Sequence, residues 1–404
     1  MTKTSNSLRV AVIGAGPAGL ALALLAAQRL PHAQVCVFDA RRADQDPSAD
    51  PRTLALSLGS VQLLRRLQAW PEHAAQPITA VHVSQAPPSG ALWPGAMPEV
   101  RLSAHDEGVE MLGAVLSYGA LVAPLQRLWN DRCAAEPARL SSRWGTPVTG
   151  LKDIGPVIEV DAAIVEPFDL AVVAEGGVFA EQARKALTHD YGQTAWVGQV
   201  GLDGGTPGQA VERFTGNGPL ALLPLPSADA PGATTTVRRA ALVWCVPSND
   251  DPVEPLADAQ RIALLNLLLP EVAGRVVDIA PLKRFALGLN AETTLVHGRT
   301  VRIGNAAQTL HPVAGQGLNL GLRDAFALVT ALRDAPTLPT ALRRVEWARA
   351  PDRWAMIAAT DFLARSFTWH WPGSGLVRGS ALALLNAARP AKSMLARQMM
   401  FGRR

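Results

Sequence analysis

Cysteine, tyrosine and charged residues are all scarce in this sequence of 404 residues. The three cysteines, Cys36, Cys133 and Cys245, are widely spaced and odd in number. They fit neither a disulfide framework nor a metal site, so we expect a reducing cytoplasmic setting and no bound metal. Charged residues make up 18% of the chain and the net charge is +4. For this length, such a small imbalance does not indicate a nucleic-acid-binding protein.

Long uninterrupted apolar runs are also missing. No run reaches the roughly eighteen residues that a membrane-spanning helix needs. The stretch Val10–Ala27 superficially resembles a secretory signal, but Gly14, Gly16 and Pro17 interrupt it and no clean cleavage site follows. We therefore expect a protein that is not integral to the membrane, either cytoplasmic throughout or peripheral at the inner membrane. With 48% apolar residues, the chain can bury the cores of two or three domains.

The N-terminal segment carries a dinucleotide-binding pattern. Leu8–Ile13 and Gln34–Asp39 are predicted strands, and the segment between them is predicted to be a turn followed by an Ala/Leu-rich helix. The turn has the spacing G-x-G-x-x-G, with Gly14, Gly16, Ala18 and Gly19 as candidate cofactor contacts. Glycines there permit a tight turn and a close approach to a pyrophosphate at the helix N-terminus. Asp39, which ends the second strand, has the spacing of a ribose-binding carboxylate.

A second glycine-rich segment lies near position 310. A predicted strand ends at Gly304, and a loop of small residues then opens onto a helix with one apolar face. The segment Ala314–Gly317 leaves backbone N–H groups free at that helix N-terminus, which forms an anion site without a charged side chain. A reduced flavin, negatively charged on its pyrimidine edge, would suit such a site. On spacing alone, an ordinary glycine-rich helix start is an equally good interpretation.

Several strings together resemble the ubiquinone-biosynthesis flavin hydroxylases (the UbiH/UbiI/UbiF/VisC-like group) of the class A flavoprotein monooxygenases. They extend over nearly the whole chain. Beside the N-terminal glycines, the strings that carry the resemblance are Asp50–Ser57, Phe214–Leu225, His311–Asn319, Thr360–Leu363 and Ala396–Gln398.

The resemblance implies a role for each matching residue. Arg52 would contact the flavin, and Gly304 and Asn305 would occupy the motif that binds the ribityl chain. Pro312, the candidate catalytic residue, would lie beside the isoalloxazine ring. Glu175 would lie between FAD and the approaching reductant. The remaining implied cofactor contacts, at or near the pyrimidine edge, are Ala314, Gly315, Gln316, Gly317, Leu318 and Asn319.

The implied chemistry is hydroxylation of an aromatic ring, here a polyprenylated phenol, with FAD, NAD(P)H and O2 through a flavin hydroperoxide. The strands Leu220–Leu225 and Ala240–Val246 would form the apolar pocket wall. Three positions depart from the family pattern, because Asn305 and Glu175 replace Asp and Gln308 replaces His. These departures keep an alternative open, in which the chain is a non-catalytic FAD-binding subunit that organises a quinone-biosynthesis complex. A flavin halogenase or oxidoreductase lacks a supporting motif.

The implied fold is α/β, a Rossmann-type FAD domain with an inserted antiparallel-sheet substrate domain and a C-terminal helical region, as in para-hydroxybenzoate hydroxylase. We expect the FAD domain at residues 1–76, 103–180 and 286–336, substrate-domain strands at 77–102 and 181–285, and the helical region at 337–404.

Two further features allow two interpretations each. His311 is either a general acid/base or, as we favour, a structural anchor in the loop. From Phe362 to Arg404 the chain has seven basic residues and no acidic one. This segment is either a helical region packed on the FAD domain or a surface that docks on anionic lipid or a complex partner.

Overall fold

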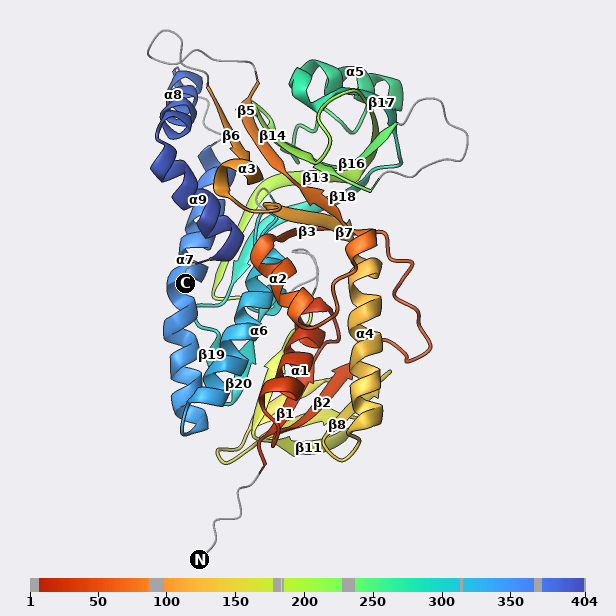
Figure 1. Ribbon diagram of the computed structural model, residues 1–404, viewed down its shortest axis with the longest axis vertical. Coiled ribbons are helices and arrows are strands. Elements are labelled where there is room, and N and C mark those ends of the chain that lie inside the picture. The colour runs from red at the N-terminus through yellow and green to blue at the C-terminus, as the bar shows by residue number, and fades with distance from the viewer. Residues whose placement is uncertain are drawn as a thin grey trace, which may run out of the picture.

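The computed structural model describes residues 7–86, 98–176, 183, 185–226, 237–312, 315–366 and 373–402, and the structural statements below concern these residues. Four sheets and the helices that cover them make up the fold. Figure 1 shows two regions, a helix-covered sheet that contains the N-terminal strand and a larger sheet near the opposite end of the molecule. The long C-terminal helices run along one side and connect the two regions.

A six-stranded sheet organises the N-terminal region. The strand order is β19 (Val296–His297), β20 (Thr300–Arg302), β12 (Leu170–Val173), β1 (Arg9–Ile13), β2 (Gln34–Asp39) and β8 (Leu140–Trp144). Neighbouring strands are parallel, except that β19 and β20 are antiparallel. Helices pack on one face of it, namely α1 (Pro17–Arg29), α4 (Tyr118–Ala135) and α6 (Gly317–Asp334). A small sheet covers the other face, formed by β9 (Gly150–Asp153), β10 (Ile158–Ala162) and β11 (Ile164–Phe168).

Strand β1 shows why the N-terminal sequence forms a central strand. Val10 and Val12 pack in the core shared with the helices, whereas Ala11 and Ile13 pack against the small sheet. Because both faces are covered, the strand is a continuous apolar run, as expected for a parallel sheet buried on both sides.

The second large sheet is mostly antiparallel. Its order is β21 (Gln308–Thr309), β18 (Lys283–Ala291), β13 (Leu187–Asp203), β16 (Arg238–Pro247), β15 (Gly218–Pro224), β14 (Gln209–Thr215), β5 (Ala80–Gln85) and β6 (Glu99–Ser103), and β17 (Arg275–Ile279) pairs with β13. Strands β14 and β5 pair in parallel. Helix α5 (Asp258–Leu268) covers one face of this sheet, with η3 (Glu271–Ala273) beside it.

The opposite face of the large sheet meets a three-stranded sheet of order β3 (Thr53–Ser57), β7 (Gly113–Ser117) and β4 (Gln76–Ile78). Ala210 and Leu223 of the large sheet pack there against Ala55 and Val115. Two helices continue the chain beside these strands, α2 (Leu58–Arg66) and α3 (Ala104–Glu107), and η1 (Glu72–Ala74) precedes β4. The short η4 turn (Gly304–Ala306) follows β20.

Three helices end the chain: α7 (Leu338–Ser366), α8 (Ser374–Ala387) and α9 (Arg389–Phe401). Helix α7 packs along α6, α8 lies against β6, and α9 lies against α2 (Figure 1). In the described ranges, no helix combines the length and the apolar character needed to cross a membrane.

The fold class expected from the sequence is confirmed. Strands of the first sheet come from four separated parts of the chain, so the dinucleotide-binding region is discontinuous and most of the second sheet is inserted into it. We keep the domain boundaries given above as a proposal.

Candidate cofactor-binding site

The turn between β1 and α1 requires glycine at two positions. Gly14 has φ of +101°, and a Cβ there would lie 2.9 Å from the backbone nitrogen of Glu175. A Cβ on Gly19 would lie 1.9 Å from the carbonyl oxygen of Gly14. Because glycine has no side chain at these two positions, α1 can lie directly against the turn, as a pyrophosphate-binding loop requires. No side chain caps the N-terminus of α1 at Gly16. Its N–H groups therefore remain available to an anion.

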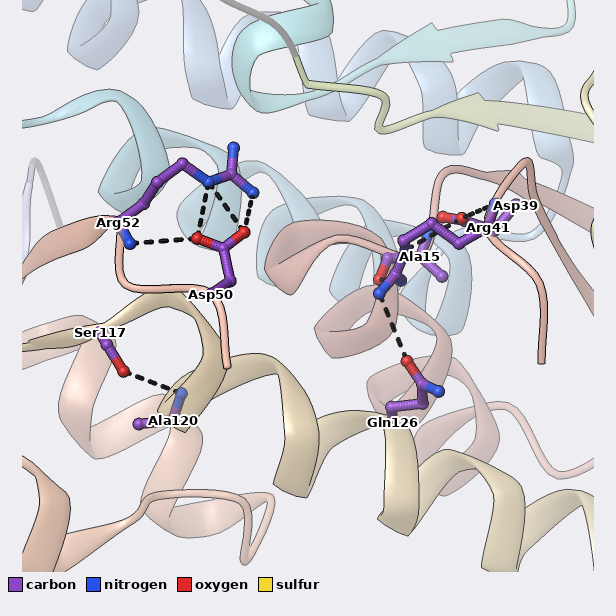
Figure 2. Close-up of polar contacts among 8 residues, drawn as sticks. All are labelled: Ala15, Asp39, Arg41, Asp50, Arg52, Ser117, Ala120 and Gln126. Atoms are coloured by element: carbon purple, nitrogen blue, oxygen red, sulfur yellow. Dashed lines mark hydrogen bonds and ion pairs between the residues drawn. The ribbon is translucent and has the colours of Figure 1, made fainter. Parts of the chain in front are cut away.

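Asp39 stabilises this turn. Its Oδ2 accepts a hydrogen bond from the backbone nitrogen of Ala15 at 2.5 Å, and its Oδ1 accepts one from the Nε of Arg41 at 3.1 Å. Arg41 also donates from Nη2 to the carbonyl oxygen of Ala15 at 2.7 Å (Figure 2). Arg41 was not predicted from the sequence, although it lies only two residues beyond Asp39. Its guanidinium places a positive charge beside the glycine turn, where a phosphate group would bind.

Arg52 lies on the other side of Tyr118 from this turn. Three side-chain hydrogen bonds join Arg52 to Asp50, two from Nε at 3.0 Å and one from Nη2 at 2.7 Å. The Arg52 guanidinium stacks 4.1 Å from the centre of the Tyr118 ring. The hydroxyl of Tyr118 would be 3.5 Å from a Cβ on Gly16. Figure 2 shows Arg52 and Asp50 together, at some distance from the cluster around Asp39. The hydrogen bonds to Asp50 raise the pKa of Arg52, so its charge is permanent.

The η4 turn brings the two glycine-rich segments together. Gly304 has φ of +58°, a left-handed conformation that favours glycine. A Cβ on Gly321 of α6 would lie 2.9 Å from the Cα of Gly304 and 3.3 Å from the Cβ of Ala18 in α1. The predicted contacts Ala18 and Gly304 are therefore neighbours, although 286 positions separate them (304 minus 18).

Asn305 follows Gly304 and faces the start of α6. Its Oδ1 would be 3.2 Å from a Cβ on Gly317. Lys185, which was not predicted from the sequence, donates from Nζ to the backbone oxygen of Asn305 at 2.8 Å. Burial lowers the pKa of this lysine to about 8, so it is mostly protonated at neutral pH. A second cation therefore lies next to the proposed ribityl-binding turn.

Gln308, noted above as a departure from the family pattern, is fully buried behind this turn. Its Oε1 accepts a hydrogen bond from the Nε of Arg353 at 2.6 Å. Asp324 accepts from the backbone nitrogen of Gly304 at 3.3 Å and from the Nε of Arg349 at 2.7 Å. Arg349 in turn pairs with Asp352 at 2.9 Å. Gln308 thus belongs to a buried polar network that joins α6 and α7 and supports the Gly304 turn.

Asn319 ties the start of α6 to β3 and α2. Its Oδ1 accepts from the backbone nitrogen of Ser57 at 2.8 Å and from the hydroxyl of Ser60 at 2.7 Å. Its Nδ2 donates to the carbonyl oxygens of Ala55 and Gly315, both at 3.1 Å. All four bonds are made within the protein, so Asn319 positions the Gly315 turn. Whether it also contacts the cofactor stays a prediction.

The loop before α6 is anchored through His311. Its side chain is 1% exposed, its Nε2 lies 2.9 Å from the Oε1 of Gln193, and its ring packs edge-to-face on Tyr191. Burial lowers the pKa of His311 to about 4, so the imidazole is neutral at pH 7. These contacts favour the structural anchor over the general acid/base, with a side chain of β13 as the partner.

Pro312 and Gly315 frame the rest of this loop. The backbone nitrogen of Gly315 donates to the carbonyl oxygen of Pro312 at 2.9 Å, and Gly315 has φ of +57°. Leu318 lies in the first turn of α6 and packs partly against the main core. Ala314, also predicted to contact the cofactor, lies outside the described residues.

Glu175 is exposed and follows β12 at the carboxyl edge of the parallel sheet. Partial desolvation, reinforced by the charge of Asp39, raises its pKa. The electrostatic effect of Asp39 and the contact with Gly14 place Glu175 beside the glycine turn, as its proposed position near the cofactor requires.

Taken together, these groups fit FAD. The uncapped N-terminus of α1 and the guanidinium of Arg41 suit the pyrophosphate and the adenosine half. Near the Gly315 turn, two buried amide atoms meet no partner among the described residues, namely Oε1 of Gln316 and Nε2 of Gln193. Buried polar atoms are rarely left unpaired, so both are suited to the polar edge of a flavin ring. No cluster of three metal-ligating side chains occurs in the described ranges.

Comparison with known proteins agrees with this fit. Residues 162–341 match the family model described as an FAD binding domain. Over 53% of this chain and 49% of the relative, the sequence is 34% identical to ubiquinone hydroxylase UbiL of Rhodospirillum rubrum. It is 26% identical to 3-demethoxyubiquinol 3-hydroxylase of Escherichia coli over 96% of both chains.

The fold is shared with HpxO of Klebsiella pneumoniae, solved in complex with FAD and uric acid. The TM-score is 0.70 at 17% identity, over 98% of this chain and 97% of the other. At that identity the likeness supports the fold and carries no substrate assignment.

Proposed function

Because this chain belongs to the FAD-dependent monooxygenases that include the ubiquinone-biosynthesis hydroxylases, we propose that it hydroxylates the ring of a prenylated phenol with NAD(P)H and O2. The observation that carries the proposal is the convergence of the two glycine-rich segments at Ala18, Gly304 and Gly321. Bound FAD would supply the redox chemistry and the activation of oxygen.

The chain's own residues would bind and orient the cofactor. The glycine turn and Arg41 would hold the pyrophosphate and the adenosine half, and Asn305 with Lys185 the ribityl chain. Pro312 and the Gly315–Leu318 turn would contact the ring system, at the N-terminus of α6, where positive dipole charge favours an anionic ring edge. Arg52 would contact the flavin from the β3 side. In this arrangement no protein nucleophile is needed.

The substrate would bind between the ring system and the large sheet. The face of β15 and β16 that is turned away from α5 presents Leu223, Val243 and Cys245. A cavity of about 540 Å³ lies between β3 and this sheet, lined in part by Thr53, Ser117 and Leu225. The lining of this cavity also includes the polar side chains of Gln199, Arg239 and Asp278. The apolar face of β15 and β16 would exclude water, which protects a reactive oxygen species from unproductive decay.

A surface on the C-terminal helices offers a route for an insoluble substrate. Large apolar side chains are exposed there, for example Leu384 at 61% and Met394 at 70%, in a segment that contains basic residues but no acidic one. Arg397 pairs with Glu107 of α3 at 3.5 Å, so part of the segment packs on the protein. We propose that the rest meets an anionic membrane surface, such as the inner membrane, peripherally.

The rival interpretation is a non-catalytic FAD-binding subunit of a quinone-biosynthesis complex. Asn305 and Glu175 favour it, because they alter groups expected to face the cofactor. Stopped-flow mixing of the FAD-loaded protein with NADH or NADPH separates the two. Nucleotide oxidation that a prenylated phenol accelerates supports the enzyme. A protein that binds FAD but shows no such acceleration with either nucleotide supports the subunit.

A further inference from the structure

One carboxylic acid lies on the neighbouring strand, beside the apolar face of β15 and β16 described above. Glu212 of β14 is directly opposite Ala221 of β15 and Val83 of β5. Its neighbours two positions away on β14 are Ala210 and Phe214, both buried. Side chains two apart on a strand share a face, so these apolar side chains flank Glu212 on its face of the sheet.

Glu212 has no counter-charge in the described part of the chain. Its Oε1 is buried and meets no hydrogen-bond partner there. The adjacent Arg213 points to the other face, where its Nε donates to the carbonyl oxygen of Leu268 at 3.0 Å. Burial raises the pKa of the Glu212 carboxyl well above its usual range, which favours the neutral, protonated form. A neutral carboxyl group can both donate and accept a hydrogen bond.

The face that carries Glu212 is turned toward the proposed flavin loop. On one side of Glu212, Ala210 packs in a cluster with Ala55, and a Cβ on Gly315 would be 3.5 Å from the Ala55 side chain. On the other side, Cys245 packs in a cluster with Tyr191, whose ring contacts His311. Ala221 of β15 is paired with Glu212 on one side and with Val243 of β16 on the other, and Cys245 lies two positions beyond Val243 on the same face. The sheet face that carries Glu212 thus extends from the cluster beside Gly315 to the cluster beside His311.

We propose that Glu212 is the substrate-contacting residue that hydrogen-bonds the ring hydroxyl of a neutral phenol and thereby orients the ring toward the flavin. This assignment rests on the proposed function and specifies how its substrate is recognised.

The same geometry specifies the substrate class. None of the side chains named above on the same face as Glu212 is cationic, so a ring that bears a carboxylate would find no counter-ion beside it. A neutral phenol or quinol satisfies the acid without burying a charge. An acid left unpaired in an apolar wall destabilises the free protein, which is a common cost of a binding site.

The test compares two ligands and three variants. The ligands are a phenol that carries a short prenyl chain and its methyl ether, which cannot donate from the ring oxygen. The variants are Glu212→Leu, Glu212→Gln and Glu271→Leu, the last removing an exposed glutamate from the same sheet domain as a matched control. Dissociation constants come from flavin absorbance titration of FAD-loaded protein, and melting temperatures from thermal scans.

We expect wild type, Glu212→Gln and Glu271→Leu to bind the phenol about tenfold or more tightly than the ether. Glu212→Leu should bind the two ligands equally and melt a few degrees higher, because the unpaired acid is gone. Retained preference in Glu212→Leu, or a lower melting temperature with both ligands lost, would overturn the role of Glu212. If Glu212→Leu does not fold, Glu212→Met replaces it with the same expected results. A wild type that ignores every phenol would overturn the proposed function itself, and this role with it.

Discussion

Replacing Asn319 with Asp should separate the cofactor loop from the rest of the fold. The substitution keeps Oδ1, which accepts from Ser57 and Ser60, but replaces the Nδ2 donor with an oxygen. That oxygen then faces the carbonyl oxygens of Ala55 and Gly315, each 3.1 Å from the original nitrogen. A protonated Asp restores at most one of the two donated bonds.

The cost follows from the bonds that are lost. Leaving one or two buried carbonyl groups unpaired costs about 1–3 kcal/mol each, so we expect the free energy of unfolding to fall by about 2–4 kcal/mol. Because Gly315 loses its tether, the turn at the start of α6 should shift. We expect the Kd for FAD to rise about tenfold or more.

Asn266→Asp is the matched control. Asn266 clamps backbone in the same manner, with Nδ2 donating to Val276 at 2.9 Å and Oδ1 accepting from it at 2.8 Å, but it lies in α5, on the face of the large sheet turned away from the cofactor loop. It should lose stability and keep FAD affinity. Equilibrium unfolding gives the first quantity and fluorescence titration of the apoprotein with FAD gives the second. If both variants weaken FAD binding equally, or neither does, Asn319 does not position the cofactor loop.

Further predictions concern other parts of the site. The pKa of His311 is about 4 in the folded protein and about 6.5 in the unfolded chain, so the neutral imidazole contributes about 3 kcal/mol of stability above pH 6.5, and this contribution is lost as the pH falls toward 4. In His311→Gln, the free energy of unfolding measured in urea should fall correspondingly less between pH 6.5 and 4. A pH profile identical to that of wild type would contradict the burial of a neutral imidazole. Asn305→Asp should tighten FAD by about 1 kcal/mol in titrations, because it restores an ionised acceptor near Lys185, and unchanged or weaker binding would show that the site is adapted to Asn. Gly317→Val should keep the circular dichroism spectrum of wild type, because the nearest atom to the new side chain is the end of the Asn305 side chain. The variant should lose FAD reduction, because a β-branched side chain would stand where the flavin approaches the backbone. Normal turnover would show that this loop does not contact the flavin. Full-length protein should co-sediment with anionic vesicles at low salt and detach at high salt, and Leu384→Glu should reduce this binding; indifference to vesicles at both salt concentrations would refute the membrane contact.

Local patterns were enough to predict the elements around the glycine turn. The run from Leu8 to Asp39 contains a buried strand, a helix and a second strand in one short stretch, and the structure confirms them as β1, α1 and β2. The need for glycine at positions 14 and 19 could be predicted as well. A side chain on Gly14 would meet the backbone at the end of β12 in the same sheet, and one on Gly19 would meet the backbone of Gly14, which is near in sequence.

Residues brought in from distant parts of the chain could not be predicted in this way. Gln308 differs from the family pattern in the sequence, and its place in a buried network becomes visible only when Arg353, on α7, is seen to contact it. Lys185 meets Asn305 across 120 positions, and Gln193 meets His311 across 118. Nothing in their local sequence distinguishes these polar residues from solvated ones.

Glu212 shows a related limit. Glu212 lies just before the string Phe214–Leu225, and nothing in the local sequence distinguishes it from a glutamate in water. Pairing with β5 and β15 and packing against β3 instead place it on the covered face. Arg41 is the exception among the missed residues, because its spacing from Asp39 would have allowed its prediction.

Incorporation of labelled oxygen tests the central claim most directly. FAD-loaded protein is incubated with a prenylated phenol, NADH or NADPH and isotopically labelled O2, and the product is analysed by mass spectrometry. We predict a ring-hydroxylated product that carries one labelled oxygen atom, formed with consumption of the nicotinamide nucleotide. Nucleotide consumption that yields only hydrogen peroxide across a panel of prenylated phenols, or a product whose oxygen comes from water, would contradict the assignment as a monooxygenase of such substrates.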